Sequence, residues 1–434
     1  MFDAKRKKVK KTKTFKRPKV QKQNQTEKKK SPEKIPMKND RKTVVLKPEK
    51  AKEVKLSGTK LEIINGTRLI KRKRRLIAAG VVALLMVVFI ILNLALPTGL
   101  VEAITNSYMK STSGKLPATS FSNEIKRFDS VGNALYLLND SYVEMYSPKG
   151  GAMQIAQHNM KNAELCASEQ RTLVFDRGKR AVNIYNNKEL LFAFETENDI
   201  FAADIATNGA YAVATDSVGY ASQVEVYNKK YSKVYTWYSS DDLVSDVLLS
   251  NNGKQLAVSM IFAKDGVLKS KVYVLKVGSS APSSTFEFDY PITSLEKMSG
   301  KFFVAMSNGG CSVIGWKSGT ASQKQIDGNL KFYDKNYNKF AIITSPEAND
   351  QNNHLTVFNK KAEVLFEFDI YAVIKGIAIS QKYVYILSEN NILKYDSLGN
   401  FEISENIYNV SNIAVLNGDR LIYTRSSTIS ELEF

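Results

Sequence analysis

The chain of 434 residues contains only two cysteines, two histidines and two tryptophans. Two cysteines cannot build a disulfide scaffold or a cysteine-based metal cluster. Two histidines leave little scope for histidine-based catalysis or metal binding. The sequence also lacks a glycine-rich loop leading from a strand into a helix, the arrangement that holds a phosphate.

A net charge is also lacking from most of the chain. Residues 1–75 contain 29 Lys and Arg against 7 Asp and Glu, whereas residues 76–434 contain 33 against 36. The formal charge of +19 therefore comes from the N-terminal segment. A near-neutral body excludes a basic globular nucleic-acid-binding protein on bulk charge.

One long hydrophobic run, residues 76–96 (LIAAGVVALLMVVFIILNLAL), contains no charged residue and a single amide, that of Asn93. As a helix it spans about 30 Å, the thickness of the hydrocarbon core of a bilayer. A buried core helix would be shorter and would show a polar stripe, and a cleaved signal peptide would have a shorter apolar region. We therefore predict one transmembrane helix, in which Asn93 offers an amide for contact with a second helix.

Basic residues flank only one end of this run. They are Lys71, Arg72, Lys73, Arg74 and Arg75. Because basic flanks stay in the cytoplasm, the sequence predicts a single-pass protein of the cell membrane with a cytoplasmic N-terminus and an extracytoplasmic C-terminal body.

The segment 1–75 has too little apolar surface to fold, so we predict a disordered basic cytoplasmic tail. Its charge favours contact with the anionic inner leaflet of the membrane. Nucleic acid is an alternative partner, although aromatic residues that stack on bases are scarce there. A further alternative is an arm that only fixes the orientation of the helix. Residues 97–114 are predicted to form a flexible linker.

From residue 115 onward, short runs rich in Val, Ile, Tyr and Phe alternate with clusters of Asn, Asp, Gly, Ser and Lys, a pattern of strands and turns. A short phrase with an aromatic or large apolar fourth residue is repeated along this region, as in VEMYSP and VNIYNN. That fourth residue falls in turn at Tyr146, Tyr185, Tyr227, Leu275, Trp316, Phe358 and Tyr395. A period near 40 residues with about four strands in each repeat is typical of a β-propeller.

An eighth repeat reaches Leu432 but lacks its outermost strand. Because an open propeller would expose two sheet edges, we predict that residues 116–121 (LPATSF) supply the missing strand. The fold class is then all-β, an eight-bladed propeller over residues 115–434. Seven blades with a C-terminal extension is the alternative. Closure by this strand would join the linker to the face opposite the connections between blades.

The order of basic tail, apolar helix and repeats resembles an uncharacterised family of bacterial membrane-anchored propeller proteins, over about residues 76–434. The repeats are similar to those of WD40-like and quinoprotein (PQQ-like) proteins. This resemblance implies a propeller but no activity, since quinoprotein dehydrogenases carry repeated tryptophans and this chain has only Trp237 and Trp316. A composition rich in Lys, Asn, Ile and Tyr is typical of an AT-rich bacterial genome.

Few residues of the repeats suggest chemistry. Cys166 and Cys311 fall three blades apart, beyond reach of a disulfide, and we expect both to be buried as small hydrophobic residues. His158 and His354 have no recognisable nucleophile nearby and are expected on the surface. The loop 346–354 offers oxygen atoms to Ca²⁺ but lacks the spacing of a calcium loop.

Acidic residues, often beside a tyrosine, recur in the connections that lead into the predicted innermost strands. In a propeller these connections gather on one face, where several acids would favour a cationic or hydroxyl-rich partner. The alternative is that they only satisfy backbone N–H groups in turns. The candidate acidic rim consists of Glu197, Asp199, Asp241, Asp242, Asp289, Tyr290, Asp369 and Tyr371.

These features predict a non-catalytic, membrane-anchored binding or scaffold protein of the bacterial cell envelope. Its propeller would engage a protein or wall-polymer partner outside the cytoplasm, while the tail meets lipid or a cytoplasmic partner. No cofactor is predicted. The alternative is a propeller enzyme, either a quinoprotein-like oxidoreductase or a glycan lyase or hydrolase, because propellers host many chemistries.

Overall fold

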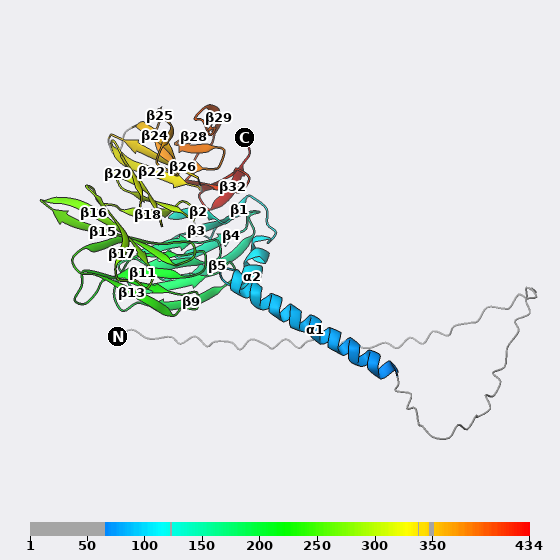
Figure 1. Cartoon of the computed structure of the whole chain (residues 1–434). Helices are drawn as coiled ribbons and strands as arrows, with labels where there is room; N and C mark the ends of the chain where they lie inside the picture. Colours follow the sequence, from blue (N-terminus) through cyan, green and yellow to red (C-terminus); the bar gives the residue numbers. More distant parts are fainter. Residues whose placement is uncertain (1–65, 122–123, 337, 347–350) are drawn as a thin grey trace, which may run out of the picture. The chain divides into compact units, whose positions relative to one another are not determined.

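Four-stranded antiparallel sheets follow one another along the chain, eight in all among the described residues (Figure 1). The computed structural model describes residues 66–121, 124–336, 338–346 and 351–434. Most of the predicted disordered tail, residues 1–65, lies outside the described residues. Leu69–Phe434 form one compact unit.

The first four blades run from innermost to outermost strand in chain order. Blade one contains β2 (Arg127–Val131), β3 (Ala134–Leu138), β4 (Tyr142–Tyr146) and β5 (Ala152–Gln157). Blade two contains β6 (Ala163–Ala167), β7 (Thr172–Asp176), β8 (Ala181–Tyr185) and β9 (Leu190–Glu195). Blade three contains β10 (Ile200–Ile205), β11 (Tyr211–Thr215), β12 (Ser222–Tyr227) and β13 (Lys233–Ser239). Blade four contains β14 (Leu243–Leu249), β15 (Gln255–Lys264), β16 (Val267–Lys276) and β17 (Pro282–Phe288).

The next three blades follow the same order, and the last one is completed from the N-terminal side. Blade five contains β18 (Ser294–Lys297), β19 (Phe302–Met306), β20 (Gly310–Gly315) and β21 (Ala321–Gln325). Blade six contains β22 (Asn329–Lys335), β23 (Lys339–Ser345), β24 (Asn352–Asn359) and β25 (Val364–Tyr371). Blade seven contains β26 (Ile374–Ile379), β27 (Val384–Ser388), β28 (Asn391–Tyr395) and β29 (Phe401–Asn406). Blade eight contains β30 (Asn412–Leu416), β31 (Arg420–Arg425), β32 (Thr428–Leu432) and β1 (Ala118–Thr119).

Closure of the ring confirms the eight-bladed prediction. The two-residue strand β1 pairs antiparallel with β32, with Ala118 opposite Ile429, so residues from both ends of the propeller share one sheet. Figure 1 shows β32, in red, beside β1. Blades one and eight also pack face to face, with Leu135 and Tyr146 of blade one in the same buried cluster as Ile422 of blade eight.

The core lies between the sheets, in clusters that each join neighbouring blades. One such cluster joins Val226 and Trp237 of blade three to Val247 and Leu256 of blade four. The repeated fourth residues of the sequence phrase occupy one of the last two positions of the third strand of a blade or directly follow it, and Tyr185 is fully buried there. The period of the sequence therefore reflects one position in each blade, at which a large side chain packs between neighbouring blades.

The first helix differs from its predicted limits. α1 (Gly66–Ala95) begins ten residues before the predicted start at residue 76, because Lys and Arg are good helix formers and extend the apolar helix. Lys71 and Arg72 therefore belong to a helix and not to a disordered tail. The side chains of the three basic residues that follow them are exposed. Among the described residues α1 is the one helix long and apolar enough to cross a membrane, over Lys73–Ala95.

The predicted flexible linker over residues 97–114 is wrong for its middle part. This segment contains α2 (Leu100–Lys110), which packs on the propeller. The amide oxygen of Asn93 accepts a hydrogen bond of 3.0 Å from the backbone N–H of Leu100, so the end of α1 caps the start of α2. Gly99 has a φ of 108°, a conformation that favours glycine, in the tight connection between the two helices.

A buried carboxylate holds the closing strand in place. Glu144 on β4 is fully buried and accepts hydrogen bonds from the Ser120 hydroxyl (2.8 Å), the Phe121 backbone N–H (3.2 Å) and the Tyr146 hydroxyl (2.7 Å). The Tyr146 hydroxyl also lies 3.1 Å from the carbonyl oxygen of Thr119. The short segment around β1 is thus fixed by side chains as well as by its two pairs with β32.

Replacement of this carboxylate tests its role. Glu144→Ala leaves several buried donors without an acceptor, so the free energy of unfolding of the full chain should fall by about 3 kcal/mol. Urea unfolding followed by tryptophan fluorescence measures this. The control is Glu164→Ala, which removes an exposed ion pair with Arg177 and should cost less than about 1 kcal/mol. Equal effects of the two variants would contradict the assigned role of Glu144.

Candidate functional site

Charged side chains gather where the innermost strands of the blades meet. They come from blades one, three, four, five and six: Arg127, Asp129, Asp204, Asp246, Glu296, Lys297, Tyr333, Asp334 and Lys335. Lys297 of blade five bonds to Asp204 of blade three at 2.9 Å, past the intervening blade four. Such contacts between non-neighbouring blades are possible only across the central channel. We call these nine residues the axial network.

Within the axial network each cation has an acidic partner. Lys335 forms an ion pair with Glu296 at 2.5 Å, and the Tyr333 hydroxyl donates a hydrogen bond of 3.0 Å to the same carboxylate. Burial would raise the pKa of Glu296, but the opposing charges of Lys335 and Arg127 lower it to about 2. Glu296 is therefore ionised, and its charge joins blades one, five and six.

Three aspartates of the network bond to the backbone of the next blade. Asp204 accepts the Leu249 N–H at 2.7 Å, Asp246 accepts the Leu295 N–H at 2.7 Å, and Asp334 accepts the Ile379 N–H at 2.8 Å. In each case the donor lies on the innermost strand of the following blade. These bonds tie blades three to four, four to five, and six to seven around the channel.

Burial changes the protonation of two of these carboxyl groups. It raises the pKa of Asp246 to about 8 and that of Asp334 to about 7, although hydrogen bonds from backbone N–H groups favour the ionised forms. Near neutral pH the network therefore has carboxyl groups that can bind a proton. The other charged groups of the axial network pair with one another, and several of these pairs hold different blades together.

The cysteines carry no sign of reactivity. Neither forms a disulfide, as predicted, and burial raises the pKa of Cys311 to about 12. The Cys166 thiol lies beside the axial network and donates a hydrogen bond of 3.1 Å to the Ala203 carbonyl oxygen, and burial raises its pKa as well. A thiol held in the protonated form is a poor nucleophile.

The two histidines have different surroundings. The surface prediction is confirmed for His354, whose side chain is 41% exposed and lies 2.7 Å from Asp369. It is wrong for His158, which is 4% exposed, because its ring nitrogens bond to the Asn139 carbonyl oxygen and the Met160 N–H. Burial lowers the pKa of His158, so the ring is a neutral hydrogen-bonding spacer. The described residues contain no group of three or more His, Cys, Asp or Glu able to hold a metal ion.

Most of the predicted acidic rim lies on the connections between blades, whereas Asp369 and Tyr371 lie at the end of the outermost strand β25, and four of its acids contact nearby side chains. Three ion pairs are formed, Asp199–Arg180 (3.4 Å), Asp242–Lys271 (3.6 Å) and Asp289–Lys269 (2.6 Å), and the Asp369 carboxylate lies 2.7 Å from the His354 ring. None of these four partners lies on an innermost strand, and Tyr290 likewise bonds to Gln323 of an outermost strand. The acids that reach the channel are those of the axial network. A binding role for Glu197, Asp241, Tyr371 and the rest of the rim stays a prediction.

The axial network is not evident from the sequence, because its members stand in strands whose other residues have the apolar pattern of buried strands. A signal was present, since an acid occupies the interior of the innermost strand in several blades, as in AADIA (202–206). Such an acid in an apolar strand needs a partner.

One face of the propeller, here called the lower face, carries the turns between first and second strands and between third and fourth strands. α2 packs on this face, as the predicted closure required. Glu102 forms a bidentate ion pair with Arg171 in the β6–β7 turn, at 2.6 and 2.7 Å. The amide of Asn106 bonds to Gln170 and Asn187, and Lys110 donates to the Gly132 carbonyl oxygen at 2.7 Å.

Burial lowers the pKa of Arg171, but the hydrogen bonds and charge of Glu102 outweigh this and leave its pKa raised. The ion pair is nearly buried, with 5% of the Arg171 side chain and 14% of the Glu102 side chain exposed. Loss of either partner would leave the other charge buried and unpaired, so α2 is held firmly.

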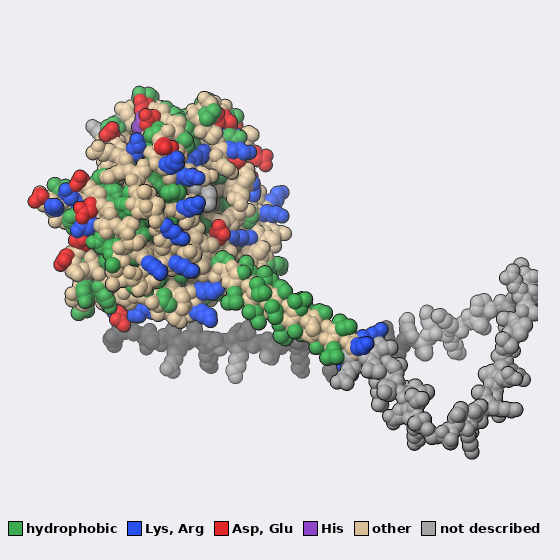
Figure 2. Space-filling model, viewed as in Figure 1, with side chains coloured by type: hydrophobic (Ala, Val, Ile, Leu, Met, Phe, Trp, Pro, Cys, Tyr) green, Lys and Arg blue, Asp and Glu red, His purple; other side chains and the backbone are tan. Residues whose placement is uncertain are grey.

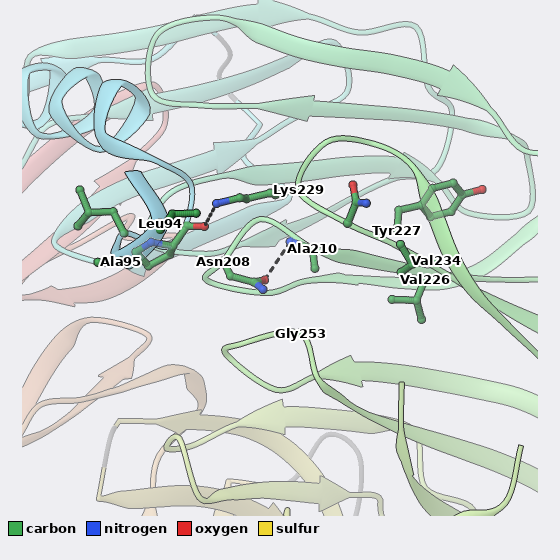
Figure 3. A pocket seen from close by; sticks show the side chains of 12 residues that line it. Leu94, Ala95, Asn208, Ala210, Val226, Tyr227, Lys229, Val234 and Gly253 are labelled. Carbon is green, nitrogen blue, oxygen red and sulfur yellow. Dashed lines mark hydrogen bonds between the residues drawn. The ribbon is translucent and has the colours of Figure 1, made fainter. Parts of the chain in front are cut away.

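An open cleft of about 360 Å³ lies beside α2, between the end of α1 and the turns of blade three (Figure 3). Leu94 and Ala95 line one side, and Asn208, Val226 and Lys229 line the other. The ammonium group of Lys229 donates a hydrogen bond of 3.0 Å to the Pro97 carbonyl oxygen. The other titratable residue of the lining is Tyr227, whose hydroxyl donates a hydrogen bond of 2.6 Å to Glu225.

The opposite, upper face carries the connections between blades and the turns between second and third strands. On blades three and four it exposes six large hydrophobic side chains: Val218, Tyr220, Tyr238, Leu243, Val267 and Leu268. We call these six residues the upper patch. Tyr220 and Tyr238 stack on each other with ring centroids 4.6 Å apart.

The strands β15 and β16 extend beyond their neighbours at this face and project from the ring (Figure 1). They remain paired out to Lys264 and Val267, whereas β14 pairs with β15 only as far as Ile261 and β17 pairs with β16 only as far as Ser270. The end of this ribbon therefore has strand edges that neither neighbouring strand covers.

Three comparisons with known proteins bear on this geometry. A model described as a family of unknown function (DUF5711) matches residues 106–434. A comparison with curated proteins finds no match. Among the solved structures that this chain resembles is BamB from Moraxella catarrhalis, with 12% identity and a TM-score of 0.49 over 71% of this chain and 96% of that chain. Two others are the C-terminal WD40 domain of Sif2 (11% identity, TM-score 0.49, 74% of this chain and 99% of that chain) and the dihydro-heme d1 dehydrogenase NirN (14% identity, TM-score 0.48, 68% of this chain and 66% of that chain). At these identities the likeness concerns the fold and does not extend to what those proteins bind or do.

The raised pKa of Asp246 predicts a pH dependence of stability. Burial raises the pKa of this carboxyl group from its ordinary 3.8 to about 8 in the folded chain, so unfolding releases a proton at pH values between these two. Stability from this group is therefore complete below about pH 4 and falls as the pH rises towards about 8. Asp246→Asn should remove this slope, a difference approaching 1.4 kcal/mol for each pH unit.

Urea unfolding of the full chain at pH values between about 5 and about 7 measures the difference. Asp289→Asn is the control, because the hydrogen bond and charge of Lys269 lower the pKa of Asp289 and its titration lies below this window. Identical slopes for the wild-type chain and Asp246→Asn would refute a protonated Asp246.

Proposed function

The chain belongs to the DUF5711 family of unknown function, and we propose that it is a non-catalytic, membrane-anchored binding protein of the bacterial cell envelope. α1 crosses the cell membrane once, with the N-terminus in the cytoplasm. The propeller lies outside the cytoplasm and holds a protein partner on the upper patch.

The membrane anchor is supported by the composition of α1. Hydrophobic side chains cover the helix, and Lys and Arg gather at its N-terminal end (Figure 2). None of the span from Lys73 to Ala95 is buried against the propeller. A long apolar helix that no protein surrounds is stabilised by the hydrocarbon core of a bilayer. The basic residues at its N-terminal end favour a cytoplasmic position for that end.

The observation that carries the binding proposal is the upper patch. Exposed aromatic and aliphatic side chains on neighbouring blades mark an interaction surface when they gather on one face. The lower face of blades one and two is already occupied by α2. Tyrosines such as Tyr220 and Tyr238 combine a large apolar area with a polar hydroxyl, which suits protein recognition.

The ribbon of β15 and β16 favours a protein over a wall polymer as this partner. Its uncovered strand edges present backbone N–H and C=O groups, which an extended peptide can pair with. Asp265 and Gly266 at the tip are flanked by Lys264 and Lys269, so charged side chains surround the apolar residues. This combination of apolar centre and charged rim is typical of protein interfaces.

The alternative is a propeller enzyme, and no described residue favours it specifically. The cations of the axial network are paired, and the two thiols are held protonated. Absorption spectra and metal analysis of the full chain purified from its own cells separate the two functions. The binding function predicts neither a chromophore nor a metal in stoichiometric amount, and the presence of either would favour the enzyme.

Photo-crosslinking in intact cells tests the binding surface. A photoreactive phenylalanine at Tyr238 or Leu268 should form adducts with the same partner protein. The control is Leu398, which is apolar and 75% exposed but lies in the β28–β29 turn of the lower face. Adducts at all three positions alike, or at none, would count against a partner on the upper patch.

A further inference from the structure

α2 is amphipathic in the reverse of the usual sense. A surface helix normally turns its apolar side to the protein and its polar side to water. Here Glu102, Asn106 and Lys110 form the side that docks on the propeller, at intervals of four residues. Val101, Ile104 and Tyr108 point away from it and are 66%, 59% and 73% exposed. Within the part of the chain that the structure describes, no protein contact covers this apolar stripe.

The stripe cannot be turned inward by rotation of the helix. The docked side is fixed by the nearly buried ion pair between Glu102 and Arg171 and by Asn106, which is 1% exposed and has both ends of its amide bonded. Rotation would leave these polar groups buried without partners. The apolar side of α2 therefore faces away from the propeller as a fixed property of the fold.

The position of α2 in the chain identifies what covers the stripe. α1 ends at Ala95 and α2 begins at Leu100, so four residues separate an apolar span from the apolar stripe. Even fully extended, they reach about 14 Å. The hydrogen bond from the Leu100 N–H to Asn93 shortens this connection further. If α1 crosses a bilayer, α2 lies within the interfacial layer of that bilayer.

We propose that α2 lies in the membrane–water interface, with Val101, Ile104 and Tyr108 in contact with the lipid of the bilayer that α1 crosses. This inference rests on the proposed membrane anchor. In this position the lower face of blades one to three faces the lipid headgroups, and the upper patch faces away from the membrane. A single helix pair then both anchors and orients the propeller.

The neighbouring turns of the lower face have matching chemistry. Lys188 in the β8–β9 turn and Lys230 in the β12–β13 turn are exposed, on the two hairpins that α2 or its approach contacts. Ammonium groups at this level can pair with lipid phosphates. Tyr108 suits the same layer, because a tyrosine ring places its apolar body in the acyl region and its hydroxyl at the headgroups.

Depth measurement in a reconstituted bilayer tests the proposal. The full chain is inserted into vesicles of phosphatidylcholine and phosphatidylglycerol with brominated acyl chains. A polarity-sensitive fluorophore is attached to a single introduced cysteine, either Val101→Cys or Ile104→Cys. Both labels should show a blue-shifted emission that is largely lost to bromine quenching. The unmodified chain, labelled under the same native conditions, gives the background from its own two cysteines.

Two further labels make the outcomes distinct. Val88→Cys, in the middle of α1, reports the anchor, and Val218→Cys on the upper face is the matched exposed control. Quenching at 88 without quenching at 101 and 104 would overturn the interfacial position of α2 and leave the anchor intact. An unquenched label at 88 would instead refute the proposed anchor. Disulfide-linked dimers of Ile104→Cys in place of quenching would overturn the lipid proposal in favour of a second copy of the chain.

Discussion

Eight sheets in a ring bury both of their faces only if the last sheet packs against the first. In this chain the connection depends on β1, a strand of two residues, and on the buried carboxylate of Glu144 that accepts hydrogen bonds from its neighbours. A strand so short contributes few backbone bonds. The side-chain bonds around Glu144 and the shared cluster of Leu135, Tyr146 and Ile422 supply the rest. The buried surfaces of all eight blades depend on this one junction.

The central channel meets a second constraint, since the innermost strands bring charged side chains together there. Lys297 and Lys335 each find an acid on another blade, and Arg127 pairs with Asp129 of its own strand. Aspartates at similar positions in β10, β14 and β22 then bond to the backbone of the next blade. The channel is thereby part of the framework of the ring, and the surfaces free for a partner lie on the outside.

Most of the fold could be predicted from the sequence, because the repeated residues are those that pack between neighbouring blades. Tyr146, Tyr185 and the related residues occupy one position in successive blades, and their spacing gave the blade count and the closing strand. α2 escaped prediction because its docking side is polar, so an isolated run of 11 residues reads as a linker. His158 was placed wrongly for a similar reason, since a lone residue in a loop carries no periodic signal of burial. The axial network and the upper patch depend on which side chains the ring brings together, and no local pattern contains that information.

The attachment of α2 also has a mechanical consequence. The chain passes from α1 through α2 to β1, the shortest strand of the ring. A pull on α1 would peel this strand away if the connection were loose. Because Glu102 and Asn106 fasten α2 to blade two and Lys110 fastens it to blade one, the load passes first into the turns of those blades. α2 thus takes up the tension before it reaches β1, and the ring can bear a pull without separation of β1 from β32.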